Sequence, residues 1–329
     1  MPQHQKIAYL FPGQGAQYPG IGKDLHQSLE VVRDTYAEAG DVLGYDIAGL
    51  SFNADASQIN LTRHTQPVLL THSIACLRAW ARQTGGDSGD AQPAAMAAGH
   101  SLGEYCALVS AGALDFGQAL RLVKRRGELM GEYGRGEMEA LMLDFETAAD
   151  LAGRHHCGVA ACNLPGQTVV GGTPEDLDAL LRDMAARFPR KRSARLKTEG
   201  AFHTHHMIEA AMRFRETLAE AEFRAPRFAV LSNFTGDFHD SDVEAIKSRL
   251  FLQLFNPVLW HKNLTRAVAG ADLLMEFGGG LGKGETPDSK RPALEGMVNK
   301  TRQMREGTDP PPAYLPVINT RTLADAMGR

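Results

Sequence analysis

The sequence predicts an α/β protein with a mostly parallel sheet, into which a smaller βαββαβ unit is inserted. Short apolar runs of strand length alternate with long stretches of helical periodicity through most of the chain, which is typical of parallel α/β folds. From Met138 the pattern changes to strand, helix, two closely spaced strands, helix and strand, the order of a ferredoxin-like unit. With 329 residues, the chain can form one large domain or two smaller ones.

The larger part begins with a buried strand at Lys6–Phe11, which ends at the loop Pro12-Gly13-Gln14-Gly15. Further strands are expected directly before Gly99 and at 228–232 and 272–277. Helices are expected at 22–43, 67–84, 104–113, 116–133, 206–221 and 242–255, with an exposed loop over 85–93. This alternation places helices on both faces of the sheet.

The inserted unit is expected to contain about 60 residues. Its strands are predicted at 138–143, 158–162, 167–171 and 191–197, and its helices at 146–154 and 174–188. Thr173 is a suitable N-cap for the second helix because Pro174 fits the first helical position. We therefore predict a small subdomain over 137–202, and a large subdomain made of 1–136 and 203–329.

Composition excludes several classes of function. The net charge of −4 gives no reason to expect nucleic-acid binding. No apolar run approaches the ~20 residues that span a bilayer, so we expect a cytoplasmic protein without a membrane segment. The four cysteines, Cys76, Cys106, Cys157 and Cys162, form no C-x-x-C pair and suggest neither zinc nor a disulfide framework.

The stretch from Gly99 to Gly103 has the G-x-S-x-G pattern of a nucleophile elbow. Glycines at both ends let a strand and a helix approach closely, while Ser101 lies at the tight turn between them. The following helix directs backbone N–H groups and its positive dipole end toward an oxyanion on a bound acyl group. Ser101 is therefore the candidate nucleophile.

A serine nucleophile needs a base, and three histidines cluster at His203, His205 and His206. Their spacing does not choose among them, and a helix N-terminus with exposed histidines is the alternative interpretation. His203 and His206 could meet across a helical turn, but no H-E-x-x-H pattern or carboxylate ligand accompanies them, so no metal site is expected. The glycine-rich stretch Gly278–Gly284 fails the phosphate-loop pattern, because Phe277 replaces the first glycine and Gly284 follows the lysine.

Six segments carry a resemblance to a known family. They are Phe11-Pro12-Gly13-Gln14-Gly15-Ala16-Gln17, Thr65-Gln66-Pro67, Gly99 to Tyr105, Arg126-Gly127-Glu128-Leu129-Met130, Gly200-Ala201-Phe202-His203, and Gln253 to Trp260. On these segments the chain resembles the malonyl-CoA:acyl carrier protein transacylases of fatty acid and polyketide synthesis. The resemblance implies a hydrolase-like α/β body with a ferredoxin-like insert.

The resemblance also implies roles for individual residues. Ser101 would be the nucleophile and His203 its general base, oriented by a backbone carbonyl near Gln253. The oxyanion hole would consist of the backbone N–H groups of Leu102 and Gln14.

Two further residues would set the substrate class. Arg126 would grip the free carboxylate of malonyl with two parallel hydrogen bonds, a geometry that lysine cannot reproduce. Phe202 would narrow the pocket beside the α-carbon. Both Phe202 and Leu102 resemble malonyl-selective relatives more than methylmalonyl-selective ones.

The implied reaction is a ping-pong transfer of malonyl from malonyl-CoA to the phosphopantetheine thiol of an acyl carrier protein, through an acyl-serine. It needs no metal or redox cofactor. The alternatives are an acyl-thioester hydrolase of the same fold, a transferase for another acyl group in a polyketide pathway, and an inactive relative that serves as a docking subunit.

Carrier proteins are acidic, and basic side chains crowd the end of the predicted insert. These are Arg187, Arg190, Lys191, Arg192, Arg195 and Lys197. They are candidates for contact with the carrier protein or with CoA phosphate, and a solvated charged face is the alternative. The sequence departs from the family where Gly278-Gly279-Gly280 replaces the usual Gly-Pro-Gly, and the tail from Leu281 onward matches nothing in the family.

Overall fold

The computed structural model describes residues 5–85, 94–284, 286–305 and 310–328. Most of the loop predicted at 85–93 therefore lies outside the described residues. The chain packs as two compact units. The first is Met1–Lys124, Glu222–Leu231 and Leu264–Arg329, and the second is Arg125–Ala221 and Ser232–Asn263. The predicted insert, 137–202, lies within the second unit, which also takes in 125–136, 203–221 and 232–263.

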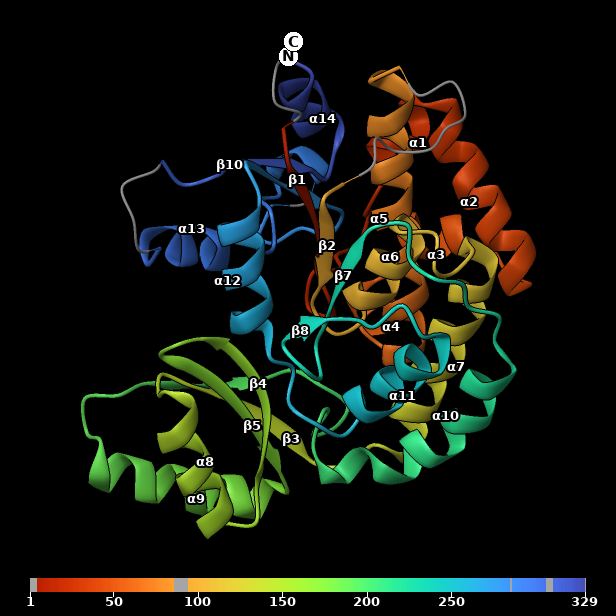
Figure 1. Ribbon diagram of the computed structural model, residues 1–329. Coiled ribbons are helices and arrows are strands. Elements are labelled where there is room, and N and C mark those ends of the chain that lie inside the picture. The colour runs from red at the N-terminus through yellow and green to blue at the C-terminus, as the bar shows by residue number, and fades with distance from the viewer. Residues whose placement is uncertain (1–4, 86–93, 285, 306–309, 329) are drawn as a thin grey trace. The chain divides into compact units, whose positions relative to one another are not determined.

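The first unit is built on parallel strands in the order β10-β9-β1-β2-β7 (Figure 1). Their bounds are β1 Ile7–Phe11, β2 Met96–Gly99, β7 Ala229–Ser232, β9 Leu273–Phe277 and β10 Ala313–Val317. Every residue of β1, β2 and β9 is buried. Parallel strands covered on both faces consist of apolar residues throughout, which explains the uninterrupted apolar runs in the sequence.

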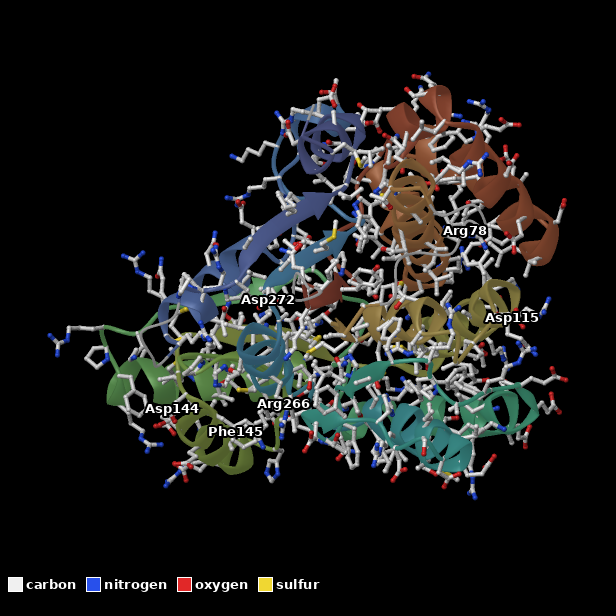
Figure 2. All side chains as sticks on the ribbon, turned by 45° about the horizontal axis from the view of Figure 1, so that its top comes forward. Arg78, Asp115, Asp144, Phe145, Arg266 and Asp272 are labelled. Carbon is white, nitrogen blue, oxygen red and sulfur yellow. The ribbon has the colours of Figure 1, made fainter. Side chains whose placement is uncertain are left out.

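Helices flank this sheet in the first unit. They are α1 Lys23–Ser28, α2 Glu30–Leu43, α3 Ile47–Asn53, α4 Ala56–Ile59, α5 Thr62–Gln83, α6 Gly103–Ser110, α13 Glu295–Gln303 and α14 Thr320–Ala326, with a 3-10 turn at Pro287–Ser289. The residues of α7 (Phe116–Tyr133) and α12 (Trp260–Gly270) are divided between the two units. Arg78 of α5 forms an ion pair with Glu38 of α2 at 2.6 Å; Figure 2 labels the arginine.

The helix predictions for the N-terminal part were wrong in two places. The single helix predicted over 22–43 is two helices, because Leu29 adopts an extended conformation (φ −126°, ψ 128°) that ends α1 and precedes α2. The helix predicted to start at Pro67 starts at Thr62 and continues through the proline. The prediction used proline as the first helical position, whereas this buried helix tolerates the missing N–H donor in its interior.

The second unit contains an antiparallel sheet in the order β4-β5-β3-β6. The elements are β3 Glu137–Leu141, α8 Phe145–Arg154, β4 Gly158–Leu164, β5 Gln167–Gly172, α9 Pro174–Arg187 and β6 Ser193–Leu196. The ferredoxin-like βαββαβ arrangement is confirmed. Thr173 caps α9 as predicted, by accepting a hydrogen bond from the Asp176 N–H. Asp144, labelled in Figure 2, caps α8 in the same way.

The other elements of the second unit follow the insert along the chain. They are the 3-10 turn His205–Met207, α10 Ile208–Glu220, β8 Asp237–Phe238 and α11 Val243–Gln253. All four cysteines are free and buried. No helix in the described ranges is both long and apolar enough to cross a bilayer.

A buried carboxyl group joins three elements of the first unit. Glu276 of β9 is fully buried and accepts hydrogen bonds from the backbone N–H groups of Ala293 and Leu294 and from the hydroxyl of Tyr314 on β10. The two N–H groups lie just before α13. Burial raises the pKa of Glu276 to about 7, although these three donors act in the opposite direction.

This raised pKa predicts a pH-dependent stability. Because the folded state holds the Glu276 proton more tightly than the unfolded chain, the contribution to stability is complete below about pH 4.5 and is lost as the pH rises through about 7. Glu276→Gln removes the titration. Urea unfolding at pH 5 and pH 8 should therefore show a smaller loss of unfolding free energy in this variant than in the wild type.

The control for this prediction is Glu222→Gln, which changes an exposed glutamate of the same unit. It should keep the wild-type pH dependence. An equal loss of stability in Glu276→Gln and the wild type would contradict the assignment.

Candidate active site

Ser101 lies at a sharp turn between β2 and α6. Its φ of 52° is in the left-handed region, which is rare for any residue except glycine. A Cβ atom at Gly99 would overlap the Gly103 carbonyl, and one at Gly103 would overlap the carbonyl of Phe11. Strand, turn and helix therefore approach as closely as the nucleophile-elbow pattern predicts.

The loop after β1 packs against this turn. His100 donates its backbone N–H to the carbonyl of Phe11 at 2.9 Å, and a Cβ atom at Gly13 would overlap the His100 carbonyl. The structure thus brings Gln14 and Leu102 into the immediate neighbourhood of Ser101. Leu102 directly precedes the first residue of α6, where helix N–H groups and the dipole favour negative charge.

Side chains of the first unit anchor the Gln14 loop. Gln14 donates from Nε2 to the Thr62 hydroxyl at 3.2 Å, and Gln17 donates from Nε2 to the side-chain oxygen of Asn60 at 2.7 Å. Gln17 in turn accepts the Gly15 N–H at 2.8 Å. The sequence did not single out Thr62 or Asn60, because they come long after the loop in the chain and only the fold brings them to it.

His203 of the second unit is also held in a left-handed conformation, with φ 63°. Its backbone N–H donates to the Leu254 carbonyl at 3.2 Å, and its Nδ1 lies 2.7 Å from the Gln253 carbonyl oxygen. A carbonyl only accepts hydrogen bonds, so the neutral ring carries its proton on Nδ1. This tautomer leaves Nε2 as the basic nitrogen, which is the form that a general base requires.

Arg126 is connected to His203 through the same glutamine. The guanidinium donates from one terminal nitrogen to Gln253 Oε1 at 3.0 Å, and both side chains are almost completely buried. A buried guanidinium is costly unless its hydrogen bonds are satisfied, and its planar fork suits a carboxylate. Gln253 therefore holds the histidine with its backbone and the arginine with its side chain.

The other candidate residues of the histidine segment, Phe202, His205 and His206, are neighbours of His203 in the chain. Phe202 is buried, at 5% exposure. The His205 and His206 rings contact at a tilt of 34°, with centroids 4.2 Å apart. Burial, followed by the charge of His205, lowers the pKa of His206. The hydroxyl of Thr204 donates to the Ala201 carbonyl and stabilises the turn that carries His203.

Two members of the basic cluster are engaged within the second unit. Arg187 pairs with Asp150 and Asp183. Arg195 pairs with Glu137, Glu139 and Asp178 across the sheet. All six members are exposed; the other four are Arg190, Lys191, Arg192 and Lys197.

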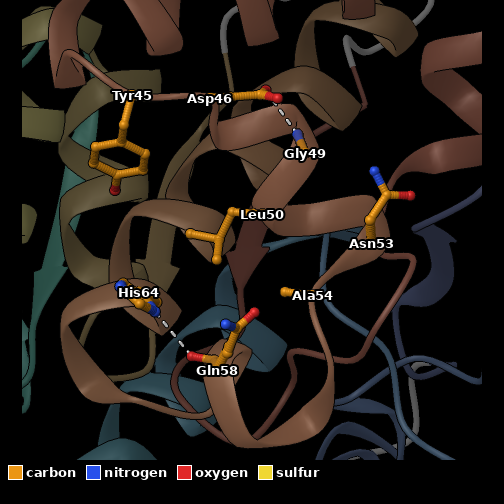
Figure 3. Close-up of a pocket in the computed structure, with 8 residues that line it drawn as sticks. All are labelled: Tyr45, Asp46, Gly49, Leu50, Asn53, Ala54, Gln58 and His64. Atoms are coloured by element: carbon orange, nitrogen blue, oxygen red, sulfur yellow. Dashed lines mark hydrogen bonds between the residues drawn. The ribbon is translucent and has the colours of Figure 1, made fainter.

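A surface pocket of about 520 Å³ lies elsewhere in the first unit, where α3, α4 and α5 meet (Figure 3). Its polar groups serve local structure: Asp46 accepts the Gly49 N–H, and the His64 ring is 2.9 Å from the Gln58 carbonyl. None of the sequence-predicted site residues lines it. No serine, threonine or cysteine is among its lining residues, so the elbow remains the candidate site.

Comparison with known proteins identifies the family of this chain. The family model of the acyl transferase domain matches residues 8–276. The malonyl CoA-acyl carrier protein transacylase of Bacillus subtilis (strain 168) is 35% identical over 308 residues, which are 91% of this chain and 91% of that protein. That of Escherichia coli (strain K12) is 37% identical over 284 residues, 84% of this chain and 89% of that protein. The chain belongs to the malonyl-CoA:acyl carrier protein transacylase family.

The fold agrees with this family as well. A solved structure of a type II PKS acyl-carrier protein in complex with its malonyl-transacylase superposes with a TM-score of 0.83 and 32% identity, over 98% of this chain and 99% of that chain. The α/β body with a ferredoxin-like unit, expected from the sequence, is confirmed. As a member of this transacylase family, the chain is an acyltransferase.

Proposed function

We propose that the protein transfers a malonyl group from malonyl-CoA to the phosphopantetheine thiol of an acyl carrier protein, through a covalent acyl-serine. The observation that carries the choice of acyl group is the buried Arg126 guanidinium, held by the same residue that orients His203. The two relatives named above are malonyl CoA-acyl carrier protein transacylases.

In the first half-reaction, Ser101 attacks the thioester carbonyl of malonyl-CoA and His203 Nε2 accepts the serine proton. The new C–O bond forms as the carbonyl becomes an oxyanion, which the backbone N–H groups of Gln14 and Leu102 stabilise. The C–S bond then breaks. CoA leaves with the proton from His203, and O-malonyl-serine remains.

In the second half-reaction, the carrier protein's thiol gives its proton to His203 and attacks the serine ester. The ester bond breaks and Ser101 regains the proton. Both steps exchange acyl bonds without oxidation or reduction, so the proposed chemistry uses no metal and no redox cofactor. CoA thioester and carrier protein are the two partners, and we place the reaction in the cytoplasm.

The Arg126 fork supports malonyl as the substrate because its parallel donors match the free carboxylate. An acyl-thioester hydrolase that acts on neutral acyl chains has no use for this buried cation. Phe202 lies directly before the general base, where a bulky ring narrows the space beside the α-carbon and disfavours methylmalonyl.

The first test is the intact mass of the protein after brief exposure to malonyl-CoA, methylmalonyl-CoA or acetyl-CoA. The wild type should gain a malonyl adduct that passes to added holo carrier protein, and Ser101→Ala should gain none. Steady release of CoA without a carrier protein would indicate a hydrolase. An adduct formed preferentially from methylmalonyl-CoA or acetyl-CoA would show that the transferred group is that acyl group and not malonyl.

Gln253→Glu tests the link between the arginine and the acyl group. The added carboxylate pairs with Arg126 and cancels its charge, so kcat/KM for malonyl-CoA should fall by about 100-fold or more while acetyl transfer changes little. The carboxylate also raises the pKa of His203, so the acid limb of the pH–rate profile should move to higher pH.

Gln253→Met is the matched control, because it removes the hydrogen bond without adding charge. It should weaken malonyl selectivity and leave the acid limb in place. Both variants keep the backbone carbonyl that orients His203. Equal losses with malonyl-CoA and acetyl-CoA would rule out the proposed role of Arg126.

Arg192→Glu tests the basic cluster as the carrier-protein contact. Charge reversal should raise KM for the carrier protein several-fold at low salt, with a smaller effect at high salt, and should leave serine acylation by malonyl-CoA unchanged. Arg321→Glu, an exposed arginine of α14, is the control. Equal effects of the two reversals would place the carrier protein elsewhere.

A further inference from the structure

The segment after β9, where the sequence departs from the family, packs against the Gln14 loop. The Gly280 N–H donates to the Ala16 carbonyl at 2.8 Å. A Cβ atom at Gly279 would lie 2.8 Å from Pro12 Cγ and from Ala16 Cβ. Gly279 and Gly280 therefore allow this segment to contact the Gln14 loop directly.

Gly279 explains why the usual proline is absent here. Its φ is +73°, whereas a proline ring fixes φ near −65°. Gly278 is also left-handed, with φ +83°. The backbone turns at these two residues and leads into the segment that starts at Leu281.

The ends of that segment, Leu281 and Arg291, form an antiparallel bridge, with reciprocal N–H to carbonyl hydrogen bonds of 2.9 and 3.0 Å. Asn319, which follows β10, donates from its side chain to the Pro287 carbonyl at 2.9 Å and so fixes the 3-10 turn to the segment after β10. We call the described residues of this segment, 281–284 and 286–291, the bridged loop.

Lys290 holds the bridged loop together. Its side chain is only 7% exposed, and its ammonium donates to the carbonyls of Gly282, at 2.9 Å, and Gly284. Burying an ammonium group costs several kcal/mol unless it is well paired, and here its hydrogen bonds go to neutral oxygens. A buried charge at this position therefore needs a compensating interaction.

Tyr18 provides that interaction and connects Lys290 to the Gln14 loop. The Lys290 ammonium lies 4.7 Å from the centroid of the Tyr18 ring, a cation–π contact in a nearly buried place. Tyr18 itself is 5% exposed. A Cβ atom at Gly280 would lie 2.7 Å from Tyr18 Cε1 and 3.0 Å from Lys290 Cβ, so these three residues form one contact.

The Gln14 loop is thus held from two sides of the first unit. Thr62 and Asn60 anchor its side chains, and Gly280, Tyr18 and Lys290 support its backbone and its far end. We propose that Lys290 is a positioning residue, which acts through Tyr18 and Gly280 to fix the backbone of residues 12–18. This proposal rests on the proposed function in one respect, which is the use of the Gln14 N–H as an oxyanion donor.

Lys290→Met tests the proposal, because it keeps the length of the side chain and removes the charge. The matched control is Lys283→Met, the same change at an exposed lysine of the same bridged loop. In Lys290→Met, kcat for malonyl transfer should fall by about tenfold or more with KM for malonyl-CoA nearly unchanged, since a misplaced oxyanion donor weakens only the transition state. Lys283→Met should behave as the wild type.

Amide hydrogen exchange gives a readout that does not depend on activity. Peptides covering residues 12–18 should exchange faster in Lys290→Met and not in Lys283→Met. Unchanged exchange in this segment would overturn the positioning role whatever the rates. Faster exchange in a protein whose wild type is never acylated by malonyl-CoA would refute the proposed function and leave the positioning role standing.

Two further variants keep the test decisive. Lys290→Arg retains a cation over the ring and should recover part of the lost kcat. If Lys290→Met does not fold, Tyr18→Leu removes the other half of the contact and should give the same faster exchange at residues 12–18. Faster exchange combined with an unchanged kcat would limit Lys290 to a structural role and overturn the link to catalysis.

Discussion

At Ser101 the chain turns from a buried parallel strand into a helix, and the serine itself has a left-handed backbone conformation. The packing around this turn determines how the other site residues of the first unit are arranged. A side chain at Gly99 or Gly103 would overlap neighbouring backbone, and one at Gly13 would overlap the turn itself. The loop that carries Gln14 can approach Ser101 only because these positions lack side chains. Close backbone packing therefore maintains a conformation that costs of order 1–3 kcal/mol.

The second unit holds a base, His203, and a cation, Arg126, in fixed orientations within a buried environment. Gln253 serves both with separate atoms, its carbonyl oxygen for His203 and its side-chain oxygen for Arg126. A backbone carbonyl, which is a neutral acceptor, orients the histidine through Nδ1. The arginine donates to the neutral side-chain amide of the same residue.

Buried ionisable groups support the first unit on both sides of β9. Glu276 ties the strand to the start of α13 and to β10, and Lys290 ties the segment after the strand to the Gln14 loop. Each group is expensive to bury and is surrounded by several polar partners, so each fixes a specific geometry rather than adding general stability.

Much of the fold was predictable because it depends on local patterns. Apolar runs marked the central strands, Thr173-Pro174 marked a helix start, and the G-x-S-x-G pattern marked the elbow. The short helices α3 and α4 and the break at Leu29 were missed, since their patterns are too short or are overridden by packing. For the site, the residues alone indicated Ser101 and left three histidines open; the family resemblance selected His203. The sequence by itself thus determined most of the elements, the family and the candidate chemical groups, and the resemblance implied a carbonyl near Gln253 for His203. Only the tertiary structure decided that the Gln253 side chain also binds Arg126, and that Lys290 reaches Tyr18. Contacts between residues so distant in the chain depend on how the elements pack.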